Sequence, residues 1–116
     1  MTTTQTLQDQ IDAPYSLSDM QIAQFQRDGY IKLRQVLSPE VIEHYGREIT
    51  EQVFRLNKQD KPLAERDTYG QAFLEVTNLW AHSDAVKPFT FGKRLARIAA
   101  ELMGVAGVRL YHDQAL

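Results

Sequence analysis

The chain contains no cysteine. This absence excludes disulfides, thiolate metal sites and cysteine nucleophiles, and it suits a reducing compartment, so we expect a cytoplasmic protein. The sequence also lacks a long apolar run, and its polar start resembles neither a signal peptide nor a membrane span. The net charge of −2 creates no field that favours nucleic acid or an anionic membrane. No Walker A loop, dinucleotide-binding glycine motif or nucleophile elbow is present.

With 116 residues, of which 43% are hydrophobic and 24% charged, the chain is one domain at most and can bury a modest core. Residues 1–16 are polar and aperiodic, and Pro14 disfavours a helix through them. We expect a mobile tail over residues 1–16, or a segment that docks on a part of the protein outside this chain. Residues 17–116 form the expected ordered part.

Two helices carry strong capping signals. For Asp19–Asp28, Ser18 and Gln21 make a capping box, and a glycine follows the last turn. For Pro39–Leu56, Ser38 supplies the cap and proline occupies the first helical position. The second helix has apolar residues at spacings of three and four, which predicts a buried stripe. That stripe consists of Ile42, Tyr45, Ile49, Val53 and Leu56.

The other elements are shorter. We expect a strand over residues 30–33, a long polar connection over 57–70 and an extended segment at 73–76. A final helix is predicted over Phe91–Met103, with Thr90 as its cap and glycines after its last turn. Its inward stripe consists of Phe91, Leu95, Ile98 and Leu102. The alternating pattern of residues 108–116 predicts a last strand, for which the sequence offers few partners. The fold class is therefore α+β and mainly helical, with an unfinished sheet.

The sequence has few candidates for chemistry. His82 and Asp84 form an H-x-D pair, which is half of a non-haem iron triad, but both lie at a junction between a loop and a helix. Ser83 and Asp84 suit capping there, and we favour that role over metal binding. His112 and Asp113 are adjacent in the last strand and therefore point to opposite faces. We expect a half-buried histidine and a solvated aspartate.

Several ordered motifs together resemble the N-terminal part of the phytanoyl-CoA dioxygenase family, the iron(II)- and 2-oxoglutarate-dependent oxygenases. The motifs are F-x-x-D-G-Y-I (residues 25–31), V-L-S-P-E (36–40), N-L-W (78–80), a helix ending in Met-Gly (103–104) and V-R-L-Y-H-D-Q-A-L (108–116). The resemblance covers residues 17–116. It implies a double-stranded β-helix, or jelly roll, of which this chain supplies the outer helices and the first strands.

In that family, Fe(II) is held by an H-x-D motif and a distant histidine that lie beyond the D-Q-x-L strand. The resemblance also places the lysine and arginine that bind 2-oxoglutarate beyond it, and it therefore argues against His82 and Asp84 as metal ligands. Gln114 matches a polar position near the mouth of the family's active site. We carry over this residue alone as a substrate-proximal candidate.

We therefore expect an N-terminal fragment or truncated member of an oxygenase that would hydroxylate a small organic substrate when complete. The chain alone is expected to bind neither Fe(II) nor 2-oxoglutarate and to be inactive. The alternative is a small non-catalytic interaction module that binds a partner through an open strand edge. For the oxygenase fragment, the exposed C-terminal strand predicts that the isolated chain self-associates or is loosely packed near its C-terminus.

Overall fold

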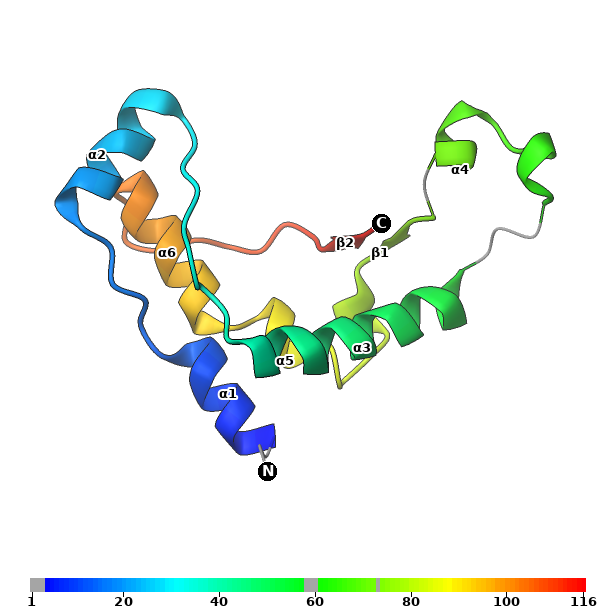
Figure 1. The fold of residues 1–116 in the computed structure, drawn as a ribbon, viewed down its shortest axis with the longest axis horizontal. Helices are drawn as coiled ribbons and strands as arrows, with labels where there is room; N and C mark the ends of the chain where they lie inside the picture. Colours follow the sequence, from blue (N-terminus) through cyan, green and yellow to red (C-terminus); the bar gives the residue numbers. More distant parts are fainter. Residues whose placement is uncertain (1–3, 58–60, 73) are drawn as a thin grey trace.

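A computed structural model of the protein describes residues 4–57, 61–72 and 74–116. The helices are α1 (Thr4–Asp12), α2 (Asp19–Asp28), α3 (Pro39–Leu56), α4 (Thr68–Ala72), α5 (Lys87–Thr90) and α6 (Lys93–Met103). Two short 3-10 turns, η1 (Leu63–Glu65) and η2 (Leu79–Ala81), and two strands, β1 (Val76–Thr77) and β2 (Gln114–Ala115), complete the described elements. The expectation of a mainly helical α+β chain is confirmed, and the two described strands pair antiparallel in one small sheet (Figure 1).

The N-terminal helix α1 corrects the expectation of a tail over residues 1–16. Leu7 and Ile11 lie one turn apart on α1, so they share a face of the helix. Both are buried, in one cluster with Val41 and Tyr45 of α3. The helix ends before Pro14, as the missing N–H of proline requires. Two apolar side chains at the right spacing are therefore enough to fold this segment once α3 offers a surface.

Helix α3 has the predicted bounds, but its buried face differs in part from the prediction. Ser38 caps it by accepting a hydrogen bond from the Val41 N–H at 3.2 Å. Tyr45 is buried as predicted, whereas Ile42 is 58% exposed and Val41 is fully buried instead. The remaining members of the predicted stripe, Ile49, Val53 and Leu56, are half-buried. The face is set by α1, which packs on the side of α3 that carries Val41 and Tyr45.

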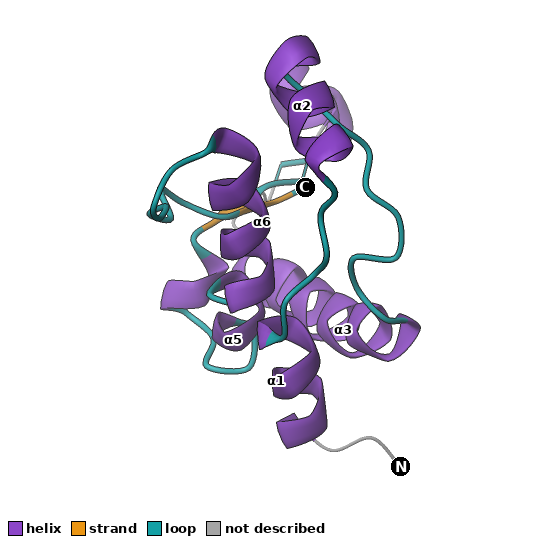
Figure 2. Ribbon diagram, turned by 90° about the vertical axis from the view of Figure 1, so that its left-hand side faces the viewer, coloured by secondary structure: helices purple, strands orange, loops and turns teal. Residues whose placement is uncertain are grey.

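Helix α2 has the predicted capping box between Ser18 and Gln21, and Gly29 ends it with a left-handed φ of 79°. It packs against α6 at one end of the molecule (Figure 2). The Gln26 side-chain amide donates to the Leu102 carbonyl of α6 at 2.6 Å. None of the α2 residues is fully buried, so α2 is a helix that covers α6 and not a part of the core.

Helix α6 begins at Lys93, two residues later than predicted, because its cap comes from another helix. The Asp12 carboxylate at the end of α1 accepts a hydrogen bond from the Lys93 backbone N–H at 3.0 Å. That bond, together with one from Gln8, lowers the pKa of Asp12. Thr90, the predicted cap, makes no capping hydrogen bond to α6.

The inward face of α6 is partly as predicted. Ile98 and Leu102 are buried, whereas Phe91 is 48% and Leu95 is 38% exposed. Gly104 ends the helix with a left-handed φ of 68°, as the Met-Gly pattern predicts. The outer part of the predicted apolar stripe therefore lies uncovered among the described residues.

The extended segments form less sheet than predicted. Residues 30–33 contain no strand, and of residues 108–116 only Gln114 and Ala115 belong to one. The connection over 57–70 contains η1 and the start of α4, with residues 58–60 outside the described part. The segment predicted at 73–76 is reduced to β1, which begins at Val76, and Phe73 also lies outside the described residues.

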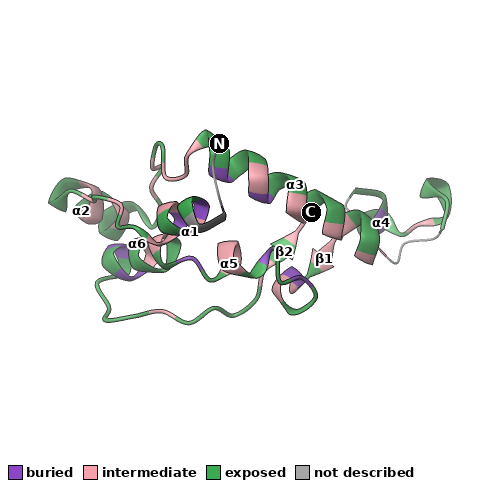
Figure 3. Ribbon diagram, turned by 90° about the horizontal axis from the view of Figure 1, so that it is seen from below, coloured by how far each residue is buried: buried purple, intermediate pink, exposed green. Residues whose placement is uncertain are grey.

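The molecule is open in shape. Its axes measure 50 × 39 × 23 Å, and its radius of gyration is 16.8 Å, against about 13 Å for a compact domain of this length. Its accessible surface of 8517 Å² exceeds the roughly 6,400 Å² typical of a monomer of this mass. Figure 3 shows short buried patches on α1, α3 and α6 between long exposed stretches. None of the described helices is long and apolar enough to cross a bilayer.

Candidate functional site

The β1–β2 ribbon brings the one carried-over candidate, Gln114, next to other polar side chains. The strands pair antiparallel, with Val76 opposite Ala115 and Thr77 opposite Gln114. Residues directly opposite in an antiparallel pair share a face, and neighbours along a strand alternate. The ribbon therefore has an apolar face with Val76 and Ala115, and a polar face with Thr77 and Gln114.

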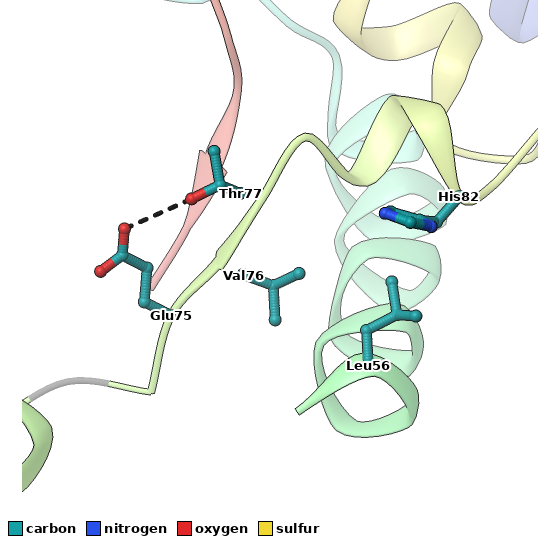
Figure 4. Close-up of a pocket in the computed structure, with 5 residues that line it drawn as sticks. All are labelled: Leu56, Glu75, Val76, Thr77 and His82. Carbon is teal, nitrogen blue, oxygen red and sulfur yellow. Dashed lines mark hydrogen bonds between the residues drawn. The ribbon is translucent and has the colours of Figure 1, made fainter. Parts of the chain in front are cut away.

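The apolar face borders a pocket of about 340 Å³ between the end of α3, β1 and the residue after η2. In Figure 4 the side chains of Leu56, Val76 and His82 converge, whereas Glu75 and Thr77 point to the other side of β1. Leu56 and Val76 provide apolar walls, and His82 supplies the only ring among the five lining residues. The pocket is thus a small gap with apolar walls from Leu56 and Val76 and polar groups from Glu75, Thr77 and His82.

The polar face centres on the Glu75 carboxylate, which sequence analysis missed. It accepts hydrogen bonds from the Tyr69 hydroxyl and the Gln114 side-chain amide, and a longer one of 3.5 Å from the Thr77 hydroxyl. The bond from Tyr69, followed by that from Gln114, lowers the pKa of Glu75. The same bond raises the pKa of Tyr69. Glu75 is therefore ionised and Tyr69 neutral at pH 7, so the pair can orient a ligand but is poorly suited to proton transfer.

Asp113 connects the ribbon to the N-L-W turn. Its carboxylate accepts hydrogen bonds from the backbone N–H groups of Leu79 at 2.8 Å and Trp80 at 3.2 Å, and from the Thr90 hydroxyl at 3.3 Å. Its own backbone carbonyl accepts a bond of 2.9 Å from the Asn78 N–H. The carboxylate thus caps η2 from a distant part of the chain.

This arrangement corrects the expectation for residues 112 and 113. Asp113 is half-buried, and its carboxylate accepts three hydrogen bonds. His112 is exposed instead, with its ring 4.6 Å from that of Tyr111. Sequence analysis missed Asp113 because its donors lie 33 and 34 residues away. A usable signal was that N-L-W and D-Q-A-L both belong to one ordered set of motifs.

The H-x-D pair lies in the junction between η2 and α5. His82 and Asp84 are both exposed. Ser83, between them, is buried and accepts a hydrogen bond from the Val86 N–H at 3.2 Å, which is the predicted capping role. The carbonyl of His82 accepts a bond from Arg55 of α3 at 3.0 Å. These contacts give the segment a structural function.

The residues present do not fit an iron centre. Over residues 4–57, 61–72 and 74–116, no three His, Cys, Asp or Glu side chains lie close enough together to hold a metal ion. Gln114 and Glu75 supply oxygen atoms, but no histidine completes a facial triad with them. No step of a reaction is therefore assigned to a metal held by these side chains.

Comparison with known proteins identifies no relative. No protein-family model matches the chain, and no curated protein or solved structure is significantly similar to it.

Proposed function

We propose that this chain forms the N-terminal, scaffold-building part of an Fe(II)- and 2-oxoglutarate-dependent oxygenase of the phytanoyl-CoA dioxygenase type. Its helices would support a double-stranded β-helix, and residues 108–116 would supply a strand at the mouth of the active site. The whole enzyme would be cytoplasmic and would hydroxylate a small organic substrate. The basis is the ordered motif set, to which the structure adds one supporting contact.

The observation that carries the proposal is the link between N-L-W and D-Q-A-L. Asp113 of the second motif binds the backbone N–H groups of Leu79 and Trp80 of the first. Two segments that the resemblance treats as parts of one unit therefore meet in space through a side chain of the motif itself. The contact also places Gln114 at a defined position on β2, opposite Thr77.

The open shape supports a scaffold role. The chain exposes roughly a third more surface than a compact monomer of its mass. Large apolar side chains just before α6, on it and after it are about half exposed, among them Phe91, Met103 and Leu110. Such side chains are usually covered by protein when a domain is complete. The proposed sheet would provide that cover.

Within the oxygenase, Gln114 would contribute to substrate positioning and not to metal binding. Its amide lies on the polar face of the ribbon and donates to Glu75. Ionised Glu75 holds the amide in one orientation, which leaves the Gln114 carbonyl oxygen as an acceptor for a hydroxyl or amide of a substrate. Iron and 2-oxoglutarate would be bound by parts of the enzyme that these residues do not provide.

The test is to determine the coding sequence downstream of the Leu116 codon and to assay both chains. The oxygenase proposal expects a downstream lysine, an H-x-D motif and a late histidine, and succinate release by the longer protein with Fe(II), 2-oxoglutarate and O₂. The 116-residue chain should release none above a blank. A downstream frame without those residues contradicts the proposal.

Turnover by the 116-residue chain would also contradict it, if His82→Ala abolished that turnover and His44→Ala did not. Such a result would restore the H-x-D pair as ligands.

The second candidate is an interaction module, and one observation favours it. Backbone groups of residues 106–112 make no backbone hydrogen bond to other described residues, so they offer an open edge to a partner.

A further inference from the structure

The start of α6 has two candidate caps, and the structure uses the more distant one. The Asp12 carboxylate at the end of α1 accepts a hydrogen bond from the Lys93 backbone N–H at 3.0 Å. In Figures 1 and 2 the end of α1 lies beside the start of α6. Thr90 is the cap that the sequence predicts. A capping side chain accepts from the N–H three residues further on, which for Thr90 is the same Lys93 N–H. Asp12 and Thr90 therefore compete for one donor.

While Asp12 caps α6, Thr90 and its neighbour contact the segment that holds the C-terminal ribbon. The Thr90 hydroxyl donates to Oδ2 of Asp113 at 3.3 Å, and the Trp80 backbone N–H donates to the same oxygen at 3.2 Å. The Phe91 ring lies edge-on to the Trp80 ring, with the centroids 5.3 Å apart. The position at which α6 begins therefore decides whether Asp113 and the N-L-W turn keep these two contacts.

Gly92 allows α1 to approach α6 closely enough for this cap. The residue is buried, and a Cβ there would lie 3.0 Å from the Ile11 carbonyl oxygen of α1. Any larger side chain would therefore push α1 away from the start of α6. Glycine is also a weak helix former, so it disfavours the extension of α6 back through this position.

The two possible starts of α6 are closely matched in backbone hydrogen bonds. At present the Phe91 N–H donates to the Lys87 carbonyl at 3.0 Å, and the Gly92 N–H donates to the Phe89 carbonyl at 3.2 Å. A capping residue has an extended backbone, so capping by Thr90 would unwind the end of α5 and break both bonds. The two residues added to α6 would form two helical bonds in return. Contacts made by α1 and by the ribbon therefore decide between the two starts.

We infer that α1 and the β1–β2 ribbon are coupled through an exchange of the cap of α6. While α1 is docked, Asp12 caps α6, and Thr90 and Phe91 contact Asp113 and the N-L-W turn. When α1 leaves, Thr90 caps the helix, α6 starts at Phe91, and both contacts are lost. Because Gln114 follows Asp113 directly, displacement of the N-terminal helix then loosens the strand that carries Gln114. The inference does not depend on the oxygenase proposal.

Gly92→Ala tests the exchange and leaves both capping side chains in place. The added Cβ pushes against the Ile11 carbonyl, and alanine favours a helix, so both effects favour the longer α6. We expect helical Cα chemical shifts at Phe91 and at position 92. The two N-L-W amides that donate to Asp113 should exchange with deuterium at least about fivefold faster. Gly46→Ala on α3 is the matched control and should change neither, because a Cβ there meets nothing within 4 Å.

Asp12→Ala tests the same exchange from the side of the cap. It should give the same helical shifts at Phe91 and the same faster exchange in the N-L-W turn. Combination with Thr90→Val should abolish the helical shifts, because no second cap remains. Coupling is reciprocal, so Asp113→Ala should accelerate deuterium exchange of the α1 amides.

Two results would overturn the inference. One is a Phe91 that stays non-helical in either of the folded variants Gly92→Ala and Asp12→Ala. The other is a longer α6 whose N-L-W amides exchange as slowly as in the unmodified chain, because the start of α6 would then have no effect on the ribbon.

Discussion

Replacing Asp113 with alanine removes the contact that joins the C-terminal segment to the rest of the molecule. The carboxylate accepts three hydrogen bonds, two of them from backbone N–H groups at 2.8 and 3.2 Å. A hydrogen bond to a charged group contributes about 1.5–3 kcal/mol, and Leu79, one of the donors, is only 2% exposed. Because Asp113 is half-buried, water replaces part of the loss. We expect Asp113→Ala to lower the free energy of unfolding by about 3 kcal/mol.

Asp113→Asn keeps the shape and one acceptor but loses the charge, so we expect about half that effect. The assay is urea unfolding followed by the fluorescence of Trp80, the single tryptophan, whose backbone N–H is one of the donors to Asp113. Asp84→Ala, which removes an exposed aspartate, is the matched control and should change the free energy by less than about 0.5 kcal/mol. Equal urea midpoints for Asp113→Ala and Asp84→Ala would refute the proposed role of Asp113.

Two further predictions concern α1. Leu7→Ala should lower the free energy of unfolding by about 2–4 kcal/mol, because Leu7 is 4% exposed and packs in the core cluster. The control Leu63→Ala should lower it far less, because Leu63 is 58% exposed. Equal melting temperatures of the two variants would show that α1 does not pack in solution. The pKa of Asp12 is lowered in the folded state, chiefly by the Lys93 N–H. Its stabilisation is therefore present above the unfolded value of about 3.9 and is lost as the pH falls through the lowered pKa. The difference in stability between the wild type and Asp12→Asn should shrink as unfolding is measured from pH 6 down to pH 3, and a constant difference would contradict the capping role.

The local chemistry of the sequence was sufficient to predict the strongest helices. The capping box of Ser18 and Gln21, the cap of Ser38 and the C-terminal Gly104 all act within a few residues of where they stand. Such signals need no knowledge of the rest of the fold, because the donors and acceptors that they satisfy belong to the same helix end. Together with Gly29, these signals give both ends of α2, the start of α3 and the end of α6.

Contacts between distant segments determine α1, the buried face of α3 and the start of α6. The segment with Leu7 and Ile11 is helical because both side chains pack against Val41 and Tyr45 of α3. The same packing buries the side of α3 that carries Val41 and leaves Ile42 exposed. Likewise, α6 begins where Asp12 of another helix can reach it, 81 residues away in the chain.

At the candidate site the sequence by itself supplied Gln114 and the motif order, through resemblance. The polar cluster around Glu75 and the hydrogen bonds from Leu79 and Trp80 to Asp113 could be identified only from the register of β1 against β2. A strand of two residues is too short for its sequence pattern to predict which strand it pairs with. The pairing energy in a sheet comes from cross-strand neighbours and not from the strand's own residues. The sequence therefore determined the helices and their ends, and the tertiary structure decided which of their faces and which carboxylates became part of the site.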